Sequence, residues 1–116
     1  MFSSPSYAEW TKVSESVDGD TAYIDFDRIR KVNEYVYFWF MIDLLKPDSA
    51  GDFSAKFYYQ GDCKLFRKKR LSFSSHSQPM GEGAPSTSYN KPDTEWTYPH
   101  PDSMREDILN AVCNRQ

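Results

Sequence analysis

The sequence has few residues of the kinds that carry catalysis or bind metals. Only two histidines occur in 116 residues. His76 lies in a serine-rich stretch and His100 stands between two prolines, so neither has the neighbouring His or Cys of a metal site. The sequence also lacks a G-x-S-x-G motif, and its "GEG" stretch lacks the lysine of a phosphate-binding loop. We therefore expect a protein that is not an enzyme and holds no metal and no cofactor.

Long apolar runs are missing as well. The longest run, residues 36–45, is far shorter than the ~20 residues that a membrane-spanning helix needs. Near the beginning of the chain, Ser6 and Ala8 are small residues at the two positions that a signal peptidase reads. Residues 1–8 are thus either the remnant of an export signal or an ordinary disordered start. Residues 9–116 have the length of one domain.

An excess of positive charge is also absent, since the formal net charge is −3. Binding to a phosphate backbone depends largely on neutralising many phosphates, so we expect no nucleic-acid partner. Aromatic residues, in contrast, make up 16% of the chain. Their large side chains have to supply much of the packing area, and their abundance favours strands over helices.

Cysteine is scarce too, because the chain contains only Cys63 and Cys113. Two cysteines allow one disulfide, and closing a loop of this length would stabilise the fold by roughly 4 kcal/mol. The alternative is a pair of unconnected buried thiols in a reducing compartment. The residues by themselves leave both interpretations open.

Alternating apolar and polar residues predict a single antiparallel sheet of about five to six strands. The pair Asp18 and Gly19 predicts a two-residue hairpin turn between the first two strands. Between Tyr35 and Ile42 the sequence has no polar side, which predicts a central strand covered on both faces. We expect another turn at residues 61–62 and one long loop over residues 74–95. The predicted strands span residues 9–16, 21–29, 34–45, 53–60 and 62–73, with a short last strand near 95–99.

The end of the chain predicts a helix over residues 103–113. Ser103 and Glu106 have the spacing of a capping box, in which each side chain satisfies a free amide at the helix start. Ile108, Leu109 and Val112 fall on one face by the 3.6-residue period, together with the second cysteine. The predicted fold class is therefore α+β, with this helix packed on the sheet, and a disulfide between Cys63 and Cys113 would join the two.

A basic run, residues 64–70, places five cations in seven positions. In a strand over residues 62–73, Lys64, Lys68 and Arg70 would share one face, with Tyr58 as an aromatic neighbour on the adjacent strand. These four residues are the candidate binding site. The run is interpreted as a solvated strand face, as a patch for an acidic or sulfated partner, or, third, as a nucleic-acid contact.

Several short stretches occur in an order that resembles the surface-adhesin protein E family of small exported bacterial domains. No single stretch is diagnostic, but together they extend over nearly the whole chain. They are "EWTKV", "AYIDFDRI", "YVYFWFMIDL", "SAKFYYQGDC", "RKKRL", "EWTYPHPDS" and "AVC". The resemblance implies an antiparallel sheet tied by a disulfide to a C-terminal helix. It also implies a protein of the periplasm or cell surface that attaches to host extracellular-matrix proteins.

We therefore expect a non-enzymatic, exported envelope or surface protein that acts as an adhesin-like binding module. Its partner would be a host extracellular-matrix protein or a sulfated glycan. An accessory structural protein of the periplasm, acting through homodimerisation, is the alternative function. A nucleic-acid-binding domain is the third.

Overall fold

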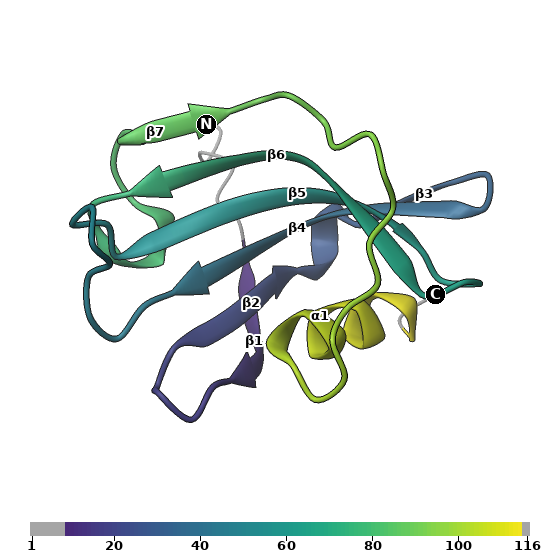
Figure 1. The fold of residues 1–116 in the computed structure, drawn as a ribbon, viewed down its shortest axis with the longest axis horizontal. Coiled ribbons are helices and arrows are strands. Elements are labelled where there is room, and N and C mark those ends of the chain that lie inside the picture. Colours follow the sequence, from purple (N-terminus) through teal and green to yellow (C-terminus); the bar gives the residue numbers. More distant parts are fainter. Residues whose placement is uncertain (1–8, 115–116) are drawn as a thin grey trace, which may run out of the picture.

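The computed structural model describes residues 9–114, so the expected signal remnant lies outside the described residues. These residues form a strongly curved sheet with a single α-helix in its curve (Figure 1). The strands are β1 (Trp10–Glu15), β2 (Thr21–Asp25), β3 (Arg30–Val32), β4 (Tyr35–Asp43), β5 (Ser54–Asp62), β6 (Arg67–His76) and β7 (Thr87–Tyr89). The helices are α1 (Met104–Cys113) and two short 3-10 helices, η1 (Phe26–Arg28) and η2 (Pro79–Gly81).

All neighbouring strands pair antiparallel, in the order β1-β2-β4-β5-β6-β7, and β3 pairs with β4 beyond the end of β2. The predicted fold class is confirmed, but the described chain has seven strands instead of five to six. One reason is that η1 interrupts the strand expected over residues 21–29. There the carboxylate of Asp25 accepts hydrogen bonds from the backbone N–H of Asp27, at 3.2 Å, and from Nε of Arg28, at 2.6 Å. The other reason is β7, which forms inside the expected long loop.

The hairpin between β1 and β2 differs from the predicted two-residue turn. The backbone N–H of Ser16 donates to the carbonyl of Asp20 at 2.8 Å, and the N–H of Gly19 donates to the carbonyl of Ser16 at 3.0 Å. These bonds enclose a three-residue loop, residues 17–19, in which Gly19 has a φ of 93°. Glycine adopts this left-handed conformation without strain, and three-residue hairpins commonly end on it.

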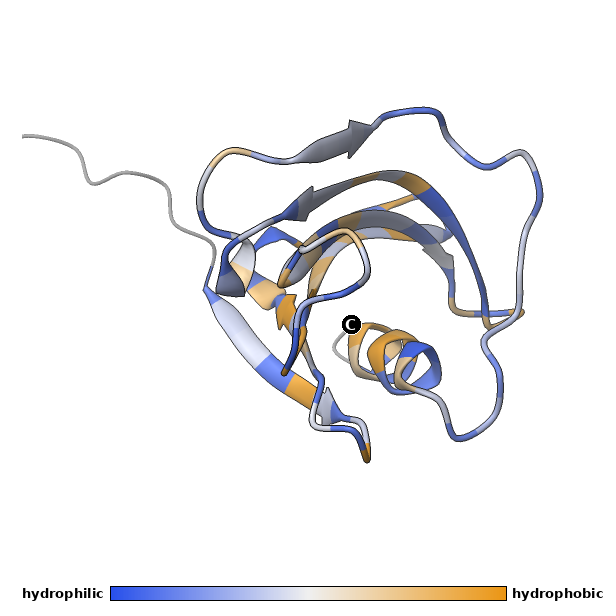
Figure 2. Cartoon of the chain, turned by 60° about the vertical axis from the view of Figure 1, so that its left-hand side comes forward, coloured by the Kyte–Doolittle hydropathy of each residue, from blue (hydrophilic) through white to orange (hydrophobic). Residues whose placement is uncertain are grey.

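The core lies between α1 and the sheet face that points toward it, which we call the inner face. Figure 2 shows the sheet curving around the helix, with apolar residues of α1 turned toward it. Strand register places Val36, Phe38, Phe40 and Ile42 of β4 on this face, beside Gly61, Tyr59, Phe57 and Ala55 of β5. Ile108, Leu109 and Val112 of α1 are fully buried against them, as their spacing predicted.

Gly61 lies within β5, so the turn predicted at residues 61–62 is wrong. A methyl group at this position would lie 3.0 Å from Cγ2 of Val36 and 3.2 Å from Cδ1 of Leu109. Glycine is therefore needed here for the close approach of the helix, not for a turn. The chain reverses instead at residues 63–66, where a side-chain oxygen of Asp62 accepts from the N–H of Leu65 and Phe66 has a φ of 53°.

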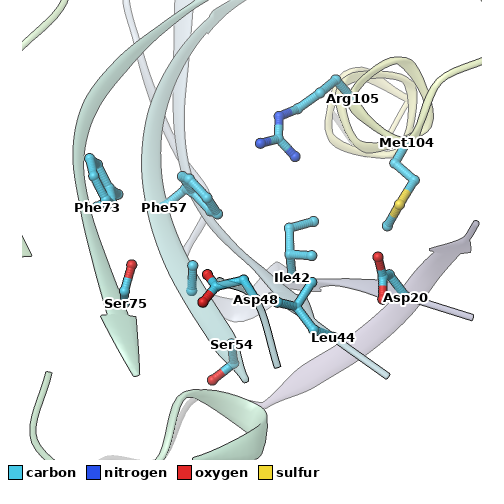
Figure 3. A pocket seen from close by; sticks show the side chains of 11 residues that line it. Asp20, Ile42, Leu44, Asp48, Ser54, Phe57, Phe73, Ser75, Met104 and Arg105 are labelled. Atoms are coloured by element: carbon cyan, nitrogen blue, oxygen red, sulfur yellow. The ribbon is translucent and has the colours of Figure 1, made fainter. Parts of the chain in front are cut away.

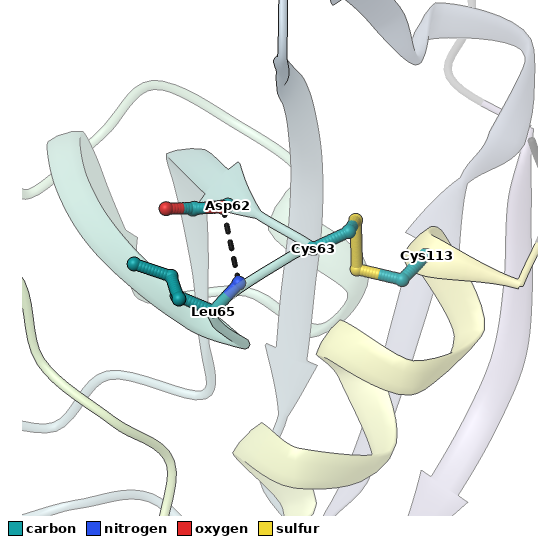
Figure 4. Close-up of a disulfide and its surroundings, with 4 residues drawn as sticks. All are labelled: Asp62, Cys63, Leu65 and Cys113. Carbon is teal, nitrogen blue, oxygen red and sulfur yellow. Dashed lines mark hydrogen bonds between the residues drawn. A yellow bond between two sulfur atoms is a disulfide. The ribbon is translucent and has the colours of Figure 1, made fainter.

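The two cysteines form a disulfide that connects this turn to the last turn of α1 (Figure 4). The Cα atoms of Cys63 and Cys113 are 5.5 Å apart, which is an ordinary separation for a disulfide. At its other end, α1 is capped as predicted. The hydroxyl of Ser103 accepts from the N–H of Glu106, whose carboxylate accepts in return from the N–H of Asp102.

The segment after β6 folds over the other face of the sheet, which we call the outer face. The hydroxyl of Ser54 donates to the carbonyl of Gln78 at 2.6 Å and accepts from the N–H of Gly81 at 2.7 Å. The N–H of Met80 donates to a side-chain oxygen of Asp43 at 2.7 Å. These bonds fix η2 on the end of β4 and β5 where both strands meet the connection at residues 44–53.

His76 is buried at the start of this segment, with 2% of its surface exposed. Its two ring nitrogens contact the hydroxyl of Ser74 at 2.9 Å and the carbonyl of Gly83 at 3.2 Å. Burial, followed by the positive charge of Lys56, lowers the pKa of His76 below its ordinary value of 6.5. The imidazole is therefore neutral in the folded protein at neutral pH.

Removing the disulfide should lower the free energy of unfolding by about 4 kcal/mol, because the unfolded chain gains the freedom of a fifty-residue loop. The test compares urea denaturation of the native protein with that of the Cys63→Ser/Cys113→Ser variant. A loss well below 1 kcal/mol would show that α1 holds its place without the covalent link.

Acidification below about pH 6.5 should destabilise the protein through His76. Because the pKa of His76 is lowered in the folded state, the unfolded state binds a proton at a higher pH than the folded state does. The free energy of unfolding therefore falls as the pH drops from 6.5 toward the pKa of the folded state. Thermal unfolding between pH 7.5 and pH 5 should show a smaller loss in a His76→Gln variant than in the native protein. The same substitution at the exposed His100 is the control and should leave the pH dependence unchanged.

Candidate binding face

Aromatic side chains cover the outer face of the sheet. Tyr35, Tyr37 and Trp39 of β4 point to this face because they alternate with the core residues of the same strand. Tyr58 of β5 lies beside Trp39 in the register and shares the outer face with it. All four side chains are half-buried, so the prediction that both faces of β4 are covered is wrong for Tyr35, Tyr37 and Trp39.

With Trp96, these rings lie in two contacting groups on the outer face: Trp96 with Tyr35, and Tyr37 and Trp39 with Tyr58. The ring centroids of Trp96 and Tyr35 are 5.4 Å apart, those of Tyr37 and Tyr58 are 6.4 Å apart, and those of Tyr58 and Trp39 are 4.8 Å apart. Trp96 reaches the row because the next residue bridges to β6, where Thr97 and Lys68 exchange two backbone hydrogen bonds of 2.9 Å. The short last strand predicted near residues 95–99 is reduced to this bridge. We call these five residues the aromatic row.

Three cations border the aromatic row. The guanidinium carbon of Arg28 lies 5.5 Å from the ring centroid of Trp39. Arg67 and Lys69 approach the ring of Trp96 to 4.5 Å and 4.8 Å. Cations at these distances from a ring face are attracted by its π electrons, and they also reduce the water contact of the ring.

Two of these cations are neutralised by buried carboxylates. Nε of Arg28 lies 2.6 Å from a carboxylate oxygen of Asp25, and Nε of Arg67 lies 2.9 Å from one of Asp62. Burial by itself would raise the pKa of Asp62, but hydrogen bonds from Arg67 and from nearby backbone N–H groups outweigh it and lower the pKa. Lys69 has no carboxylate partner within residues 9–114, so its charge beside Trp96 is uncompensated.

The structure does not bring the four predicted site residues together. Tyr58 lies on the outer face, whereas Lys68 and Arg70 lie on the inner face, paired in register with Gly61 and Tyr59. Lys68 Nζ lies 5.4 Å from the ring centroid of Tyr59. Lys64 is exposed in the turn that precedes β6. The expected strand over residues 62–73 begins only at Arg67.

A bulge in β6 explains why Tyr58 was wrongly predicted on the same face as Lys68 and Arg70. Tyr59 pairs with Arg70 but Tyr58 pairs with Ser72, so Leu71 has no partner on β5. One unpaired residue reverses the alternation, and Phe73 therefore joins Arg70 on the inner face. Arg67 and Lys69 were not predicted on the outer face for this reason, and Trp96 was not because it reaches the face through the bridge of Thr97 to Lys68. The available signal was in β4, where the outward residues are Tyr and Trp, which have polar tips, and the inward ones are Val and Phe.

The model of the surface-adhesin protein E family matches residues 10–114 of this sequence. This chain belongs to the surface-adhesin protein E family. It is accordingly an adhesin-like surface protein, and the family indicates a protein that binds host molecules and does not catalyse a reaction. No curated protein sequence matches it.

Solved structures of Haemophilus influenzae protein E share the fold. One of them, crystal form II, superposes with a TM-score of 0.67 at 17% identity and covers 95% of this chain and 91% of that chain. A structure from a non-typeable strain has a TM-score of 0.59 at 16% identity, covering 97% of this chain and 80% of that chain. At this identity the likeness concerns the fold alone. Within residues 9–114 no helix has the length and apolar character to cross a membrane.

Replacing Arg67 by Gln should lower the melting temperature by several degrees, because it leaves the buried carboxylate of Asp62 without its charged partner. Lys69→Gln is the matched control and should change the melting temperature by less than about 3 °C. The difference between the native protein and Arg67→Gln should shrink below pH 4, since a protonated Asp62 no longer needs the cation. Equal melting temperatures of the two variants at pH 7 would contradict this role of the ion pair.

Proposed function

We propose that this adhesin-like protein binds a host extracellular-matrix protein or a sulfated glycan through the aromatic row on its outer face. The observation that supports the proposal is the gathering of five partly exposed rings, in two contacting groups, on a sheet face that α1 does not cover. Tyrosine and tryptophan are enriched at interfaces because they bury a large area and lose little conformational freedom. Large aromatic side chains that gather partly exposed on one face are typical of a docking surface.

The chemistry of the face favours stacking over charge. Arg28 and Arg67 are already paired with buried carboxylates, so a partner gains little from their charge. Lys69 offers its ammonium group beside Trp96, where a sulfate or an acidic side chain could be held next to the rings. Lys64, Lys68 and Arg70 remain predicted contacts. Because they do not lie on the outer face, they would have to bind a different, anionic region of the partner.

The test measures retention on immobilised heparin and on immobilised matrix proteins. A Trp39→Ser/Tyr58→Ser variant should bind at least tenfold more weakly, since central aromatic residues carry most of the energy of an interface. Tyr98→Ser is the matched control, because Tyr98 is exposed but does not belong to the aromatic row. Circular dichroism has to show that each variant is folded.

A Lys64→Ser/Lys68→Ser/Arg70→Ser variant separates the two candidate surfaces. If the aromatic row is the site, this variant should stay within about twofold of the native affinity at physiological salt, where exposed charges are screened. A strong loss in this variant, with none in Trp39→Ser/Tyr58→Ser, would transfer the proposal to the three cations. Unchanged retention of both variants would remove both surfaces from the function.

Homodimerisation is the second candidate function, and the edge of the sheet supports it. Among the described residues β1 pairs only with β2, which leaves the backbone groups of its other edge available to a second copy. Light scattering coupled to size exclusion should then give twice the monomer mass of 13.5 kDa. Binding to DNA that falls steeply with salt, without binding to heparin, would instead favour the nucleic-acid alternative.

A further inference from the structure

An open cleft of about 330 Å³ lies on the inner face, beside the first turn of α1 (Figure 3). It forms because the helix is shorter than the strands that it covers. Ten helical residues extend about 15 Å, whereas the nine residues of β5 extend about 30 Å. The disulfide holds the end of α1 at one end of β5, so the other end of the inner face stays uncovered.

Apolar side chains line most of this cleft. Phe57 and Phe73 stack on neighbouring strands with their ring centroids 5.9 Å apart, and Ile42 and Met104 approach from β4 and from α1. The volume lies at the lower end of the range for small-molecule sites in proteins. Walls of this kind suit a compact apolar group of the size of one aromatic ring.

Arg105 extends from α1 into the cleft with an unusual lack of partners. Its guanidinium carbon lies 5.1 Å from the ring centroid of Phe40 and 5.0 Å from that of Phe57. Within residues 9–114 the guanidinium makes no hydrogen bond and no ion pair. Stacking uses the flat side of the group and leaves the N–H groups at its edge available to a carboxylate.

The surroundings make this cation unfavourable in the absence of a ligand. Arg105 lies in the first turn of α1, where the helix dipole disfavours positive charge. Lys68 is a further cation on the same face, and its pKa is lowered by burial and then by the charge of Arg105. The nearest acids on the helix are engaged elsewhere, Glu106 with the N–H of Asp102 and Asp107 with the hydroxyl of Ser14.

We propose that the cleft is a binding site for a carboxylate attached to a compact apolar group, with the carboxylate on Arg105 and the apolar group between Phe57, Phe73 and Met104. Both a free organic acid and the C-terminal residue of a polypeptide have this chemistry. The site lies on the opposite side of the sheet from the aromatic row and is separate from the proposed function.

Two acids at the rim fix the direction in which such a ligand lies. Asp20 accepts a hydrogen bond from the N–H of Leu45 at 3.0 Å, and Asp48 accepts from the N–H of Ala50 at 2.9 Å. Their side chains line the cleft and repel an anion from that end. The carboxylate is therefore directed to Arg105 and the apolar group toward the rings.

The experiment titrates the protein with 3-phenylpropionate and follows the methyl signal of Met104 and the ring signals of Phe57 and Phe73 by NMR. Binding should saturate with a dissociation constant on the order of 1 mM, as expected for a ligand of this size. The neutral amide of the same acid should bind at least tenfold more weakly, and so should the acid to an Arg105→Gln variant. Lys64→Gln, at an exposed cation, is the matched control and should bind as the native protein does.

A second titration identifies the source of the carboxylate. Acetyl-Ala-Phe with a free C-terminus should bind more tightly than 3-phenylpropionate if the natural ligand is a polypeptide end, and less tightly if it is a free acid. The absence of saturable binding of both compounds overturns the proposal. Equal binding to native protein and to a folded Arg105→Gln variant overturns it as well. The Trp39→Ser/Tyr58→Ser variant should bind normally, since its substitutions lie on the outer face.

Discussion

The packing of α1 into the curve of the sheet is the contact on which the rest of the structure depends. The helix supplies Ile108, Leu109 and Val112 to a core that otherwise consists of one sheet face. Gly61 lets Leu109 approach the backbone of β5, and the disulfide fixes the end of the helix beside the turn at residues 63–66. The partly exposed aromatic outer face and the open cleft on the inner face both follow from this arrangement. The one α-helix of the described residues is short, covers only part of the inner face and does not lie on the outer face.

The elements determined by local chemistry could be predicted from the sequence. Ser103 caps α1 as its spacing with Glu106 indicated, and the apolar face of the helix is the buried one. The fold class followed from the alternation in the strands and from the family resemblance. The disulfide remained an open alternative on the residues alone, because pairing depends on where the turn at residues 63–66 places Cys63 relative to α1.

The faces of β6 could not be predicted, because they depend on interactions that composition does not reveal. A strand was expected from residue 62, but Asp62 holds a turn through its side chain, and Phe66 adopts a left-handed conformation that glycine normally occupies. The bulge at Leu71 then reverses the alternation once more. The turn and the bulge each shift the pairing of the strand by one residue. A shift of one residue moves every following side chain to the opposite face of the sheet. Tyr58 and Lys68, predicted as neighbours, lie on opposite sides of the sheet for this reason.

The basic run shows how a charge cluster in sequence can disperse in space. Arg67 neutralises the buried Asp62, Lys69 lies against Trp96, and the guanidinium of Arg70 lies 3.7 Å from a carboxylate oxygen of Asp93. Lys68 is turned to the inner face, where its ammonium group contacts the ring of Tyr59 and donates to the hydroxyl of Thr97 at 3.2 Å. An array of cations along one surface, such as phosphate-backbone binding requires, is therefore not formed by this strand. The basic run instead provides cations that stack on aromatic rings. These cations reduce the contact of the rings with water, and the rest of the ring surface stays available to a binding partner. This physical character agrees with a small acidic domain whose outer face is built for stacking and whose unpaired cations are divided between the two faces, Lys69 on the outer and Arg105 on the inner.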